Sequence, residues 1–129
     1  MVNYGFTKDL NIPYGTAIKR VKDALKKEGF GVLTEIDVQG IMKEKLGIDM
    51  SKYMILGACN PANAYQSILA EENIGLMLPC NVIVYEKGGK TVLSFIRPTV
   101  AMQIIDNASL QKVSDEVEEK LKKAFDAVK

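Results

Sequence analysis

The sequence predicts an α/β fold in which a mixed five-stranded sheet has helices packed against it. Apolar, strand-like runs alternate with amphipathic helical segments, and a Gly-Gly pair joins the last two strand-like runs. A long amphipathic segment then ends the chain, which gives the order β-α-β-α-β-α-β-β-α. Because two cores would have about 65 residues each, we expect residues 1–129 to form a single domain.

The expected elements follow from apolar periodicity and from residues that start or stop helices. Strands are expected at residues 2–10, 30–36, 52–58, 75–86 and 91–97. Helices are expected at residues 13–29, 38–47, 61–73 and from about 109 to the end. Residues 98–105 are expected to form a short irregular or helical link.

Residues at the ends of the expected helices support this assignment in the first half of the chain. Pro13 is tolerated in a first helical turn, and Gly29 can adopt the left-handed conformation that ends a helix. The second helix is likewise bounded by Asp37, an N-cap residue, and by Gly47. The unbroken apolar run at 52–58 indicates a strand in a central position.

The second half is supported in the same way. Asn60 and Pro61 have the residue types of an N-cap and a first helical position. Residues 87–90, "KGGK", predict a hairpin turn between two alternating strands. The last helix has one apolar face made of Leu110, Val113, Val117, Leu121, Ala124, Phe125 and Val128.

Composition excludes several classes of function. A hydrophobic content of 47% with 26% charged residues is typical of a folded chain rather than a disordered one. The net charge of +1 gives no reason to expect nucleic acid or a membrane surface as a partner. Without histidine, neither a Ser-His-Asp triad nor a His-ligated metal or haem site can form. No signal peptide or membrane-spanning run is evident, so we expect a cytoplasmic protein with reduced thiols.

The two cysteines are the main candidates for chemistry, in "GACNPANA" and "LPCNV". Cys59 is expected between a strand end and a helix start, where partly positive N–H groups favour a thiolate or bind an anion. The alternative is a small buried side chain, which is also common for free cysteine. Cys80 lies in an expected strand and is either part of the core or a second, resolving thiol.

Three asparagines near the cysteines are candidate ligand-binding residues. Asn60 is expected to cap the helix that follows it, and Asn63 lies in the first turn of that helix. Asn81 is a polar amide in an apolar strand, so a ligand, a partner subunit or a bulged backbone must satisfy it if it is buried.

Two carboxylates form a further candidate. Glu35 and Asp37 point to the same side of an extended segment and could act together on a proton or a hard cation. Asp37 is equally well placed to cap the next helix. Because neither two carboxylates nor two thiolates complete a metal site, we expect no metal and no cofactor.

Three segments, in order along the chain, are "GFGVLTEID", "LGACNPANA" and "GLMLPCNVIVYE". Together they resemble the prokaryotic domain-of-unknown-function family 302. The resemblance implies a small α+β two-layer sandwich, often dimeric, without an established activity. One departure is Arg97 before Pro98, where the resemblance implies an acidic residue.

Three functions remain open, and the sequence does not decide whether the protein is an enzyme. The first is a module that binds a small ligand or anion at the turn formed by Cys59, Asn60 and Pro61. The second is thiol-dependent redox or sulfur-transfer chemistry, with Cys59 as nucleophile and Cys80 as resolving thiol. The third is an interaction domain with inert core cysteines. We also expect a homodimer.

Overall fold

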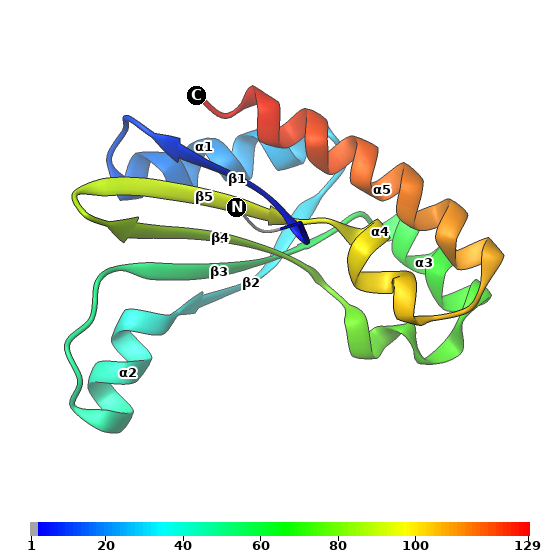
Figure 1. Cartoon of the computed structure of the whole chain (residues 1–129), viewed down its shortest axis with the longest axis horizontal. Helices are drawn as coiled ribbons and strands as arrows, with labels where there is room; N and C mark the ends of the chain where they lie inside the picture. Colours follow the sequence, from blue (N-terminus) through cyan, green and yellow to red (C-terminus); the bar gives the residue numbers. More distant parts are fainter. Residues whose placement is uncertain (1–2) are drawn as a thin grey trace.

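The computed structural model describes residues 3–129 and has five strands and five α-helices within that range (Figure 1). The strands are β1 (Gly5–Leu10), β2 (Gly31–Asp37), β3 (Tyr53–Cys59), β4 (Cys80–Lys87) and β5 (Lys90–Ile96). The α-helices are α1 (Tyr14–Lys27), α2 (Val38–Leu46), α3 (Pro61–Ala70), α4 (Pro98–Ala101) and α5 (Ala108–Ala127). Two 3-10 helices, η1 (Glu72–Met77) and η2 (Met102–Ile104), complete the chain. The predicted α+β sandwich and its five strands are confirmed.

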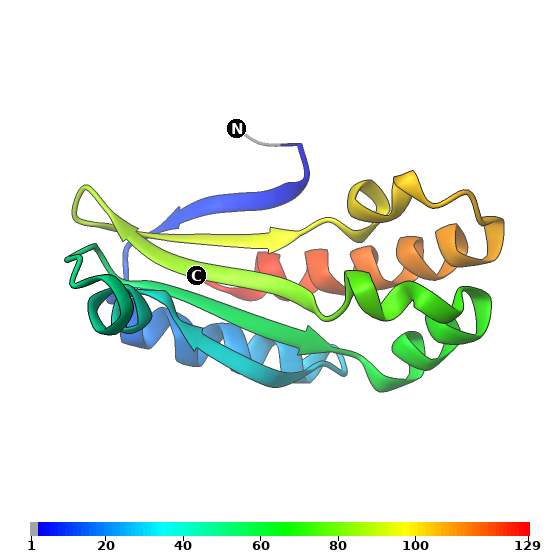
Figure 2. The same cartoon turned by 90° about the horizontal axis from the view of Figure 1, so that it is seen from below.

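The strands form one sheet in the order β1-β5-β4-β3-β2, and α1 and α5 cover one face of it (Figure 2). Side chains of β3, β4 and β5 that point toward these helices, such as Leu56, Val82 and Phe95, are fully buried. They pack against helix residues such as Leu25 and Leu121 in the main hydrophobic core. The apolar stripes predicted for the helices therefore stabilise the fold by burial against the sheet.

Neither α1 nor α5 covers the opposite face of the sheet, and α2 lies on that side only at one end, beside the start of β3 (Figures 1 and 2). Strand registers place Ile36, Ile55 and Ile83 side by side on this face. In the next row, the rings of Tyr53 and Tyr85 stack with their centroids 5.3 Å apart. We call this surface, made by these five side chains, the open face. The isoleucine row continues into Ser94 and Thr7, so this side of the sheet is apolar over β2, β3 and β4 and polar over β5 and β1 at that row.

The prediction of a mixed sheet is wrong, because all four strand pairings are antiparallel. For two paired strands to be parallel, the chain that connects them must cross back to the end of the sheet at which the first strand began. Only α1 makes such a return, and it joins the two edge strands, β1 and β2, which do not pair. The connections that contain α2 and α3 stay at one end of the sheet and so join antiparallel neighbours.

The predicted strand at 75–86 begins later, because β4 starts only at Cys80. Pro79 has no N–H group to donate to the ladder of the central strand. The preceding residues form η1 instead, and Ile74 packs with Met102 and Leu110 in a small second core. Burial in this second core, rather than strand pairing, fixes the segment.

Other boundaries agree with the sequence to within a few residues. Gly88 and Gly89 adopt positive φ angles of 59° and 78° in the hairpin between β4 and β5, as their sequence predicts. Of the first predicted strand, residue 2 lies outside the described residues, and β1 begins at Gly5. None of the helices in residues 3–129 is both long enough and apolar enough to cross a membrane.

Candidate functional site

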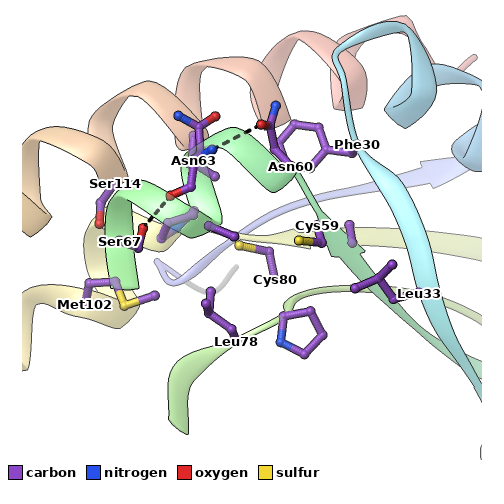
Figure 3. A pocket seen from close by; sticks show the side chains of 15 residues that line it. Phe30, Leu33, Cys59, Asn60, Asn63, Ser67, Leu78, Cys80, Met102 and Ser114 are labelled. Atoms are coloured by element: carbon purple, nitrogen blue, oxygen red, sulfur yellow. Dashed lines mark hydrogen bonds between the residues drawn. The ribbon is translucent and has the colours of Figure 1, made fainter. Parts of the chain in front are cut away.

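A cavity of about 250 Å³ lies where the ends of β3 and β4 meet α3, with α4 and α5 completing its wall (Figure 3). Its wall is mostly apolar. The lining residues are Phe30, Leu33, Ala58, Cys59, Asn60, Asn63, Ala64, Ser67, Leu78, Pro79, Cys80, Pro98, Met102, Ser114 and Val117. Four of the predicted site residues, the two cysteines and Asn60 and Asn63, therefore line one cavity.

The strand end beside the cavity is held by close packing around Gly57. A Cβ atom at this position would lie 2.7 Å from Cγ of Pro79 and would also collide with the side chain of Thr34. Real Cβ contacts are not this short, so the approach of Pro79 to β3 depends on glycine. This packing fixes Pro79 as part of the cavity wall.

The start of α3 is capped as the sequence predicts. Asn60 Oδ1 accepts a hydrogen bond of 3.3 Å from the backbone N–H of Asn63. The N–H of Ala64 donates to the carbonyl of Asn60 at 2.9 Å, and Pro61 has no N–H. Of the first four amides of α3, only that of Ala62 is outside these bonds, so the helix start has little capacity for an anion.

The Asn63 side chain is 4% exposed, and both of its polar atoms make a hydrogen bond to a neighbouring side chain. Its Oδ1 accepts a hydrogen bond of 2.9 Å from Lys120 Nζ on α5, and its Nδ2 donates to Gln66 Oε1 at 3.2 Å. One turn later, the buried hydroxyl of Ser67 donates to the Asn63 carbonyl at 2.9 Å. The Lys120 bond ties α5 to α3, and the Ser67–Asn63 bond lies beside the cavity (Figure 3).

The two cysteines come from neighbouring strands. Ala58 on β3 is paired with Cys80 on β4, and Cys59 is the residue that follows Ala58. Both are free thiols; Cys59 is half-buried and Cys80 is 9% exposed. Burial, with a smaller contribution from Cys59, raises the pKa of Cys80 from 9.0 to about 11. At neutral pH the Cys80 thiol is therefore protonated, which makes it a weak nucleophile.

The remaining predicted site residues lie away from the cavity. The Asn81 side chain is exposed, so its amide group does not need a hydrogen-bond partner within the protein. Glu35 Oε2 is 2.9 Å from Lys22 Nζ on α1, in a pair exposed to solvent. Asp37 accepts a hydrogen bond from the N–H of Gly40 and caps α2, which was one of the two roles predicted for it. The structure thus does not bring these three residues to the site.

Sequence reasoning missed several lining residues. Ser114 is four residues after Leu110 and three before Val117, so it falls within the apolar stripe of α5. A serine in such a stripe is a detectable signal of a polar group facing the interior. Pro98 and Met102 lie in the segment that the sequence left as an irregular link, and no local pattern indicates their role.

Metal ligation has no obvious site in the described part of the chain. Within residues 3–129, no group of three or more Cys, Asp or Glu side chains is arranged to hold a metal ion. The candidate site is therefore a small cavity with neutral polar groups on one side and two thiols on another.

The comparisons with known proteins agree with the resemblance seen in the sequence. Residues 6–128 match the family model described as domain of unknown function DUF302. A similar solved structure is the crystal structure of an uncharacterized conserved DUF302 protein from Bacillus stearothermophilus. Its TM-score is 0.92 at 29% sequence identity, over 99% of this chain and 100% of that chain. No curated protein matches the sequence.

Proposed function

Since the chain belongs to the DUF302 family, for which the family description names no activity, we propose a function from the cavity itself. The protein is a binding module for a small molecule, held between α3 and the ends of β3 and β4. The observation that carries this proposal is the cavity of about 250 Å³, which Cys59, Asn60, Asn63 and Cys80 line together. Concave, mostly apolar sites with a few polar groups are typical of small-ligand binding.

The anionic ligand predicted from the sequence receives less support than a neutral one. Anion sites at helix starts use several unpaired N–H groups. Here the Asn60 side chain and backbone carbonyl already accept two of these groups, from Asn63 and Ala64.

Thiol chemistry also receives less support than binding. A resolving cysteine must attack as a thiolate, and burial raises the pKa of Cys80 to about 11.

The reduced state of both thiols fits the cytoplasmic location that we propose from the sequence.

The binding proposal can be tested by filling the cavity. Ala64 lines the cavity and is partly exposed on α3, so Ala64→Leu adds volume there while keeping a residue that favours helices. We expect at least one of phenol, toluene, cyclohexanol, benzoate and sulfate to shift backbone amide NMR signals around Cys59 and Asn63 at millimolar concentration. The variant should lose that response.

The matched control is Ala62→Leu, because Ala62 is exposed on the same helix and outside the cavity wall. It should bind the probe as the wild type does. Absence of any response to all five probes in the wild type would contradict the proposed function. An unchanged response in Ala64→Leu would place the binding elsewhere.

A homodimer remains our proposal for the assembly of this chain. The open face supplies its support: Ile36, Ile55 and Ile83 form an apolar row, with the stacked Tyr53 and Tyr85 beside it. Because these side chains carry no charge at neutral pH, a second copy can pack on this face without like-charge repulsion. The two sheets would then stack face to face.

A further inference from the structure

We propose that the cavity selects a small, neutral, aromatic molecule that carries one hydrogen-bond donor, a phenol being the simplest case. This inference rests on the proposed function, because it names the ligand class of the same cavity. Three properties of the wall support it: the absence of charge, the hydrogen-bonding state of its polar groups, and its sulfur content.

The wall offers nothing to balance a charged ligand. None of the lining residues in the described part of the chain is Lys, Arg, Asp or Glu. The Lys120 ammonium bonds to Oδ1 of the lining residue Asn63, 2.9 Å away, and that bond already gives it a partner. Since an unpaired charge is strongly disfavoured in an apolar site, a neutral ligand fits better than a carboxylate or a phosphate.

The hydrogen-bonding state of the wall favours a ligand that donates. Each polar atom of the Asn63 side chain already makes one hydrogen bond, to Lys120 or to Gln66. Each polar atom of the Asn60 side chain also makes one, to the Asn63 N–H or, at 3.5 Å, to the Glu28 carbonyl. The Ser67 hydroxyl has already donated its hydrogen to the Asn63 carbonyl. A hydroxyl oxygen has two lone pairs, so Ser67 Oγ remains as an acceptor only. A donor on the ligand can therefore bond to Ser67 Oγ.

The size and sulfur content of the wall favour an aromatic ring. A cavity of roughly 150 Å³ holds benzene, and this one measures about 250 Å³. One substituted ring is therefore an appropriate size. Three of the lining side chains contain sulfur, namely Cys59, Cys80 and Met102 (Figure 3). Polarisable sulfur makes favourable contacts with ring edges, which a saturated ring of the same size lacks.

The test measures dissociation constants of phenol, cyclohexanol, toluene and benzoate with the full chain at pH 7, followed by amide NMR shifts. Phenol should bind roughly 2- to 10-fold more tightly than cyclohexanol, because only phenol gains the contacts with sulfur. Benzoate should show no saturable binding. Equal or tighter binding of cyclohexanol would overturn the aromatic part of the proposal.

The hydrogen-bond donor is tested with Ser67→Ala. This change should weaken phenol roughly 3- to 10-fold and leave toluene, which has the same shape without the hydroxyl, within about 2-fold. Ser114→Ala is the matched control, because Ser114 is the other serine of the wall and lies on a different helix, α5. It should leave the binding of phenol unchanged. If Ser114→Ala weakened phenol binding and Ser67→Ala did not, Ser67 would not be the acceptor and the assignment would be overturned.

The outcomes separate this inference from the proposed function. Saturable binding of benzoate or sulfate without phenol binding would refute the neutral aromatic class and leave a small-ligand module in place. No response to any probe would refute both. Binding of phenol that persists in Ala64→Leu would also refute the inference, because the ring would then lie outside this cavity.

Discussion

Cys80 shows how strongly position in the fold changes the chemistry of a single residue. It begins the central strand, is 9% exposed, and faces the main core as well as the cavity. Removal of water disfavours the thiolate more than the thiol. Its neighbour Cys59 lines the same cavity but is half-buried, so two cysteines with similar sequence surroundings occupy different environments.

The raised pKa of Cys80 predicts a loss of stability in alkaline solution. Between pH 9 and about 11 the unfolded thiol loses its proton while the folded thiol keeps it. The unfolded state then binds fewer protons, so the free energy of unfolding falls as pH rises through this window. The full effect is on the order of 3 kcal/mol. Urea unfolding of wild type and Cys80→Ala between pH 8 and 10.5 measures it.

Cys80→Ala should be less stable than the wild type at pH 8 but should show a shallower decline with pH. Cys59→Ala is the matched control, since it keeps the buried thiol, and its decline should resemble that of the wild type. Parallel curves for wild type and Cys80→Ala would contradict the assignment.

At the scale of elements, α4 is held to α5 by one carboxylate. Glu118 accepts hydrogen bonds from Arg97 Nε and Nη2 at 3.3 and 3.2 Å. It also accepts from the backbone N–H of Thr99 at 3.1 Å and from the Thr99 hydroxyl at 2.6 Å. The helix is only four residues long and supplies Pro98 to the cavity wall. A short helix has little stability of its own, so this cluster determines where α4 lies.

Replacement of Glu118 by Ala should destabilise the protein by about 1.5–3 kcal/mol, because hydrogen bonds to a charged group are lost and Arg97 loses its partner. The Glu118 side chain is 15% exposed, so solvent screens it only in part. Chemical denaturation compared with Glu119→Ala, an exposed neighbour, measures the difference. We expect less than about 0.5 kcal/mol for the control. Equal effects would contradict a specific role of Glu118.

At the scale of the whole molecule, the fold has only two layers. The helices α1 and α5 cover one face of the sheet, whereas in the described chain only α2, at one end of the sheet, lies on the side of the open face (Figure 2). Apolar side chains such as Ile55 and Ile83 remain half-buried there. Contiguous apolar surface of this kind commonly marks an interface between proteins.

The proposed homodimer is tested by sedimentation at tens of micromolar. The wild type should sediment as a dimer, and Ile83→Lys should be monomeric, because two copies would bury opposed lysines at the centre of the interface. The matched control is Ile104→Lys, since Ile104 is 79% exposed and lies in η2, away from the sheet. A monomeric wild type would refute the proposal. Dissociation by Ile104→Lys alone would move the interface away from the open face.

The sequence by itself determined the local features of this protein. Helix caps are examples: Asn60 and Asp37 each accept from the N–H three residues ahead, because capping depends on neighbouring backbone groups. The Gly88-Gly89 hairpin and the apolar stripe of α5 were predicted for the same reason. The placement of Cys59, Asn60 and Asn63 together was also predictable, since they are nearly consecutive.

Only the tertiary structure decided which distant segments meet. The antiparallel order of the sheet, the packing of η1 against Met102 and Leu110, and the arrival of Ser114 at the cavity depend on contacts between residues far apart in sequence. For that reason Asn81 and Glu35 lie outside the cavity, although their residue types suit a binding site. A cavity is the space that several elements leave between them, so its charge, size and hydrogen-bonding groups are fixed only when those elements pack.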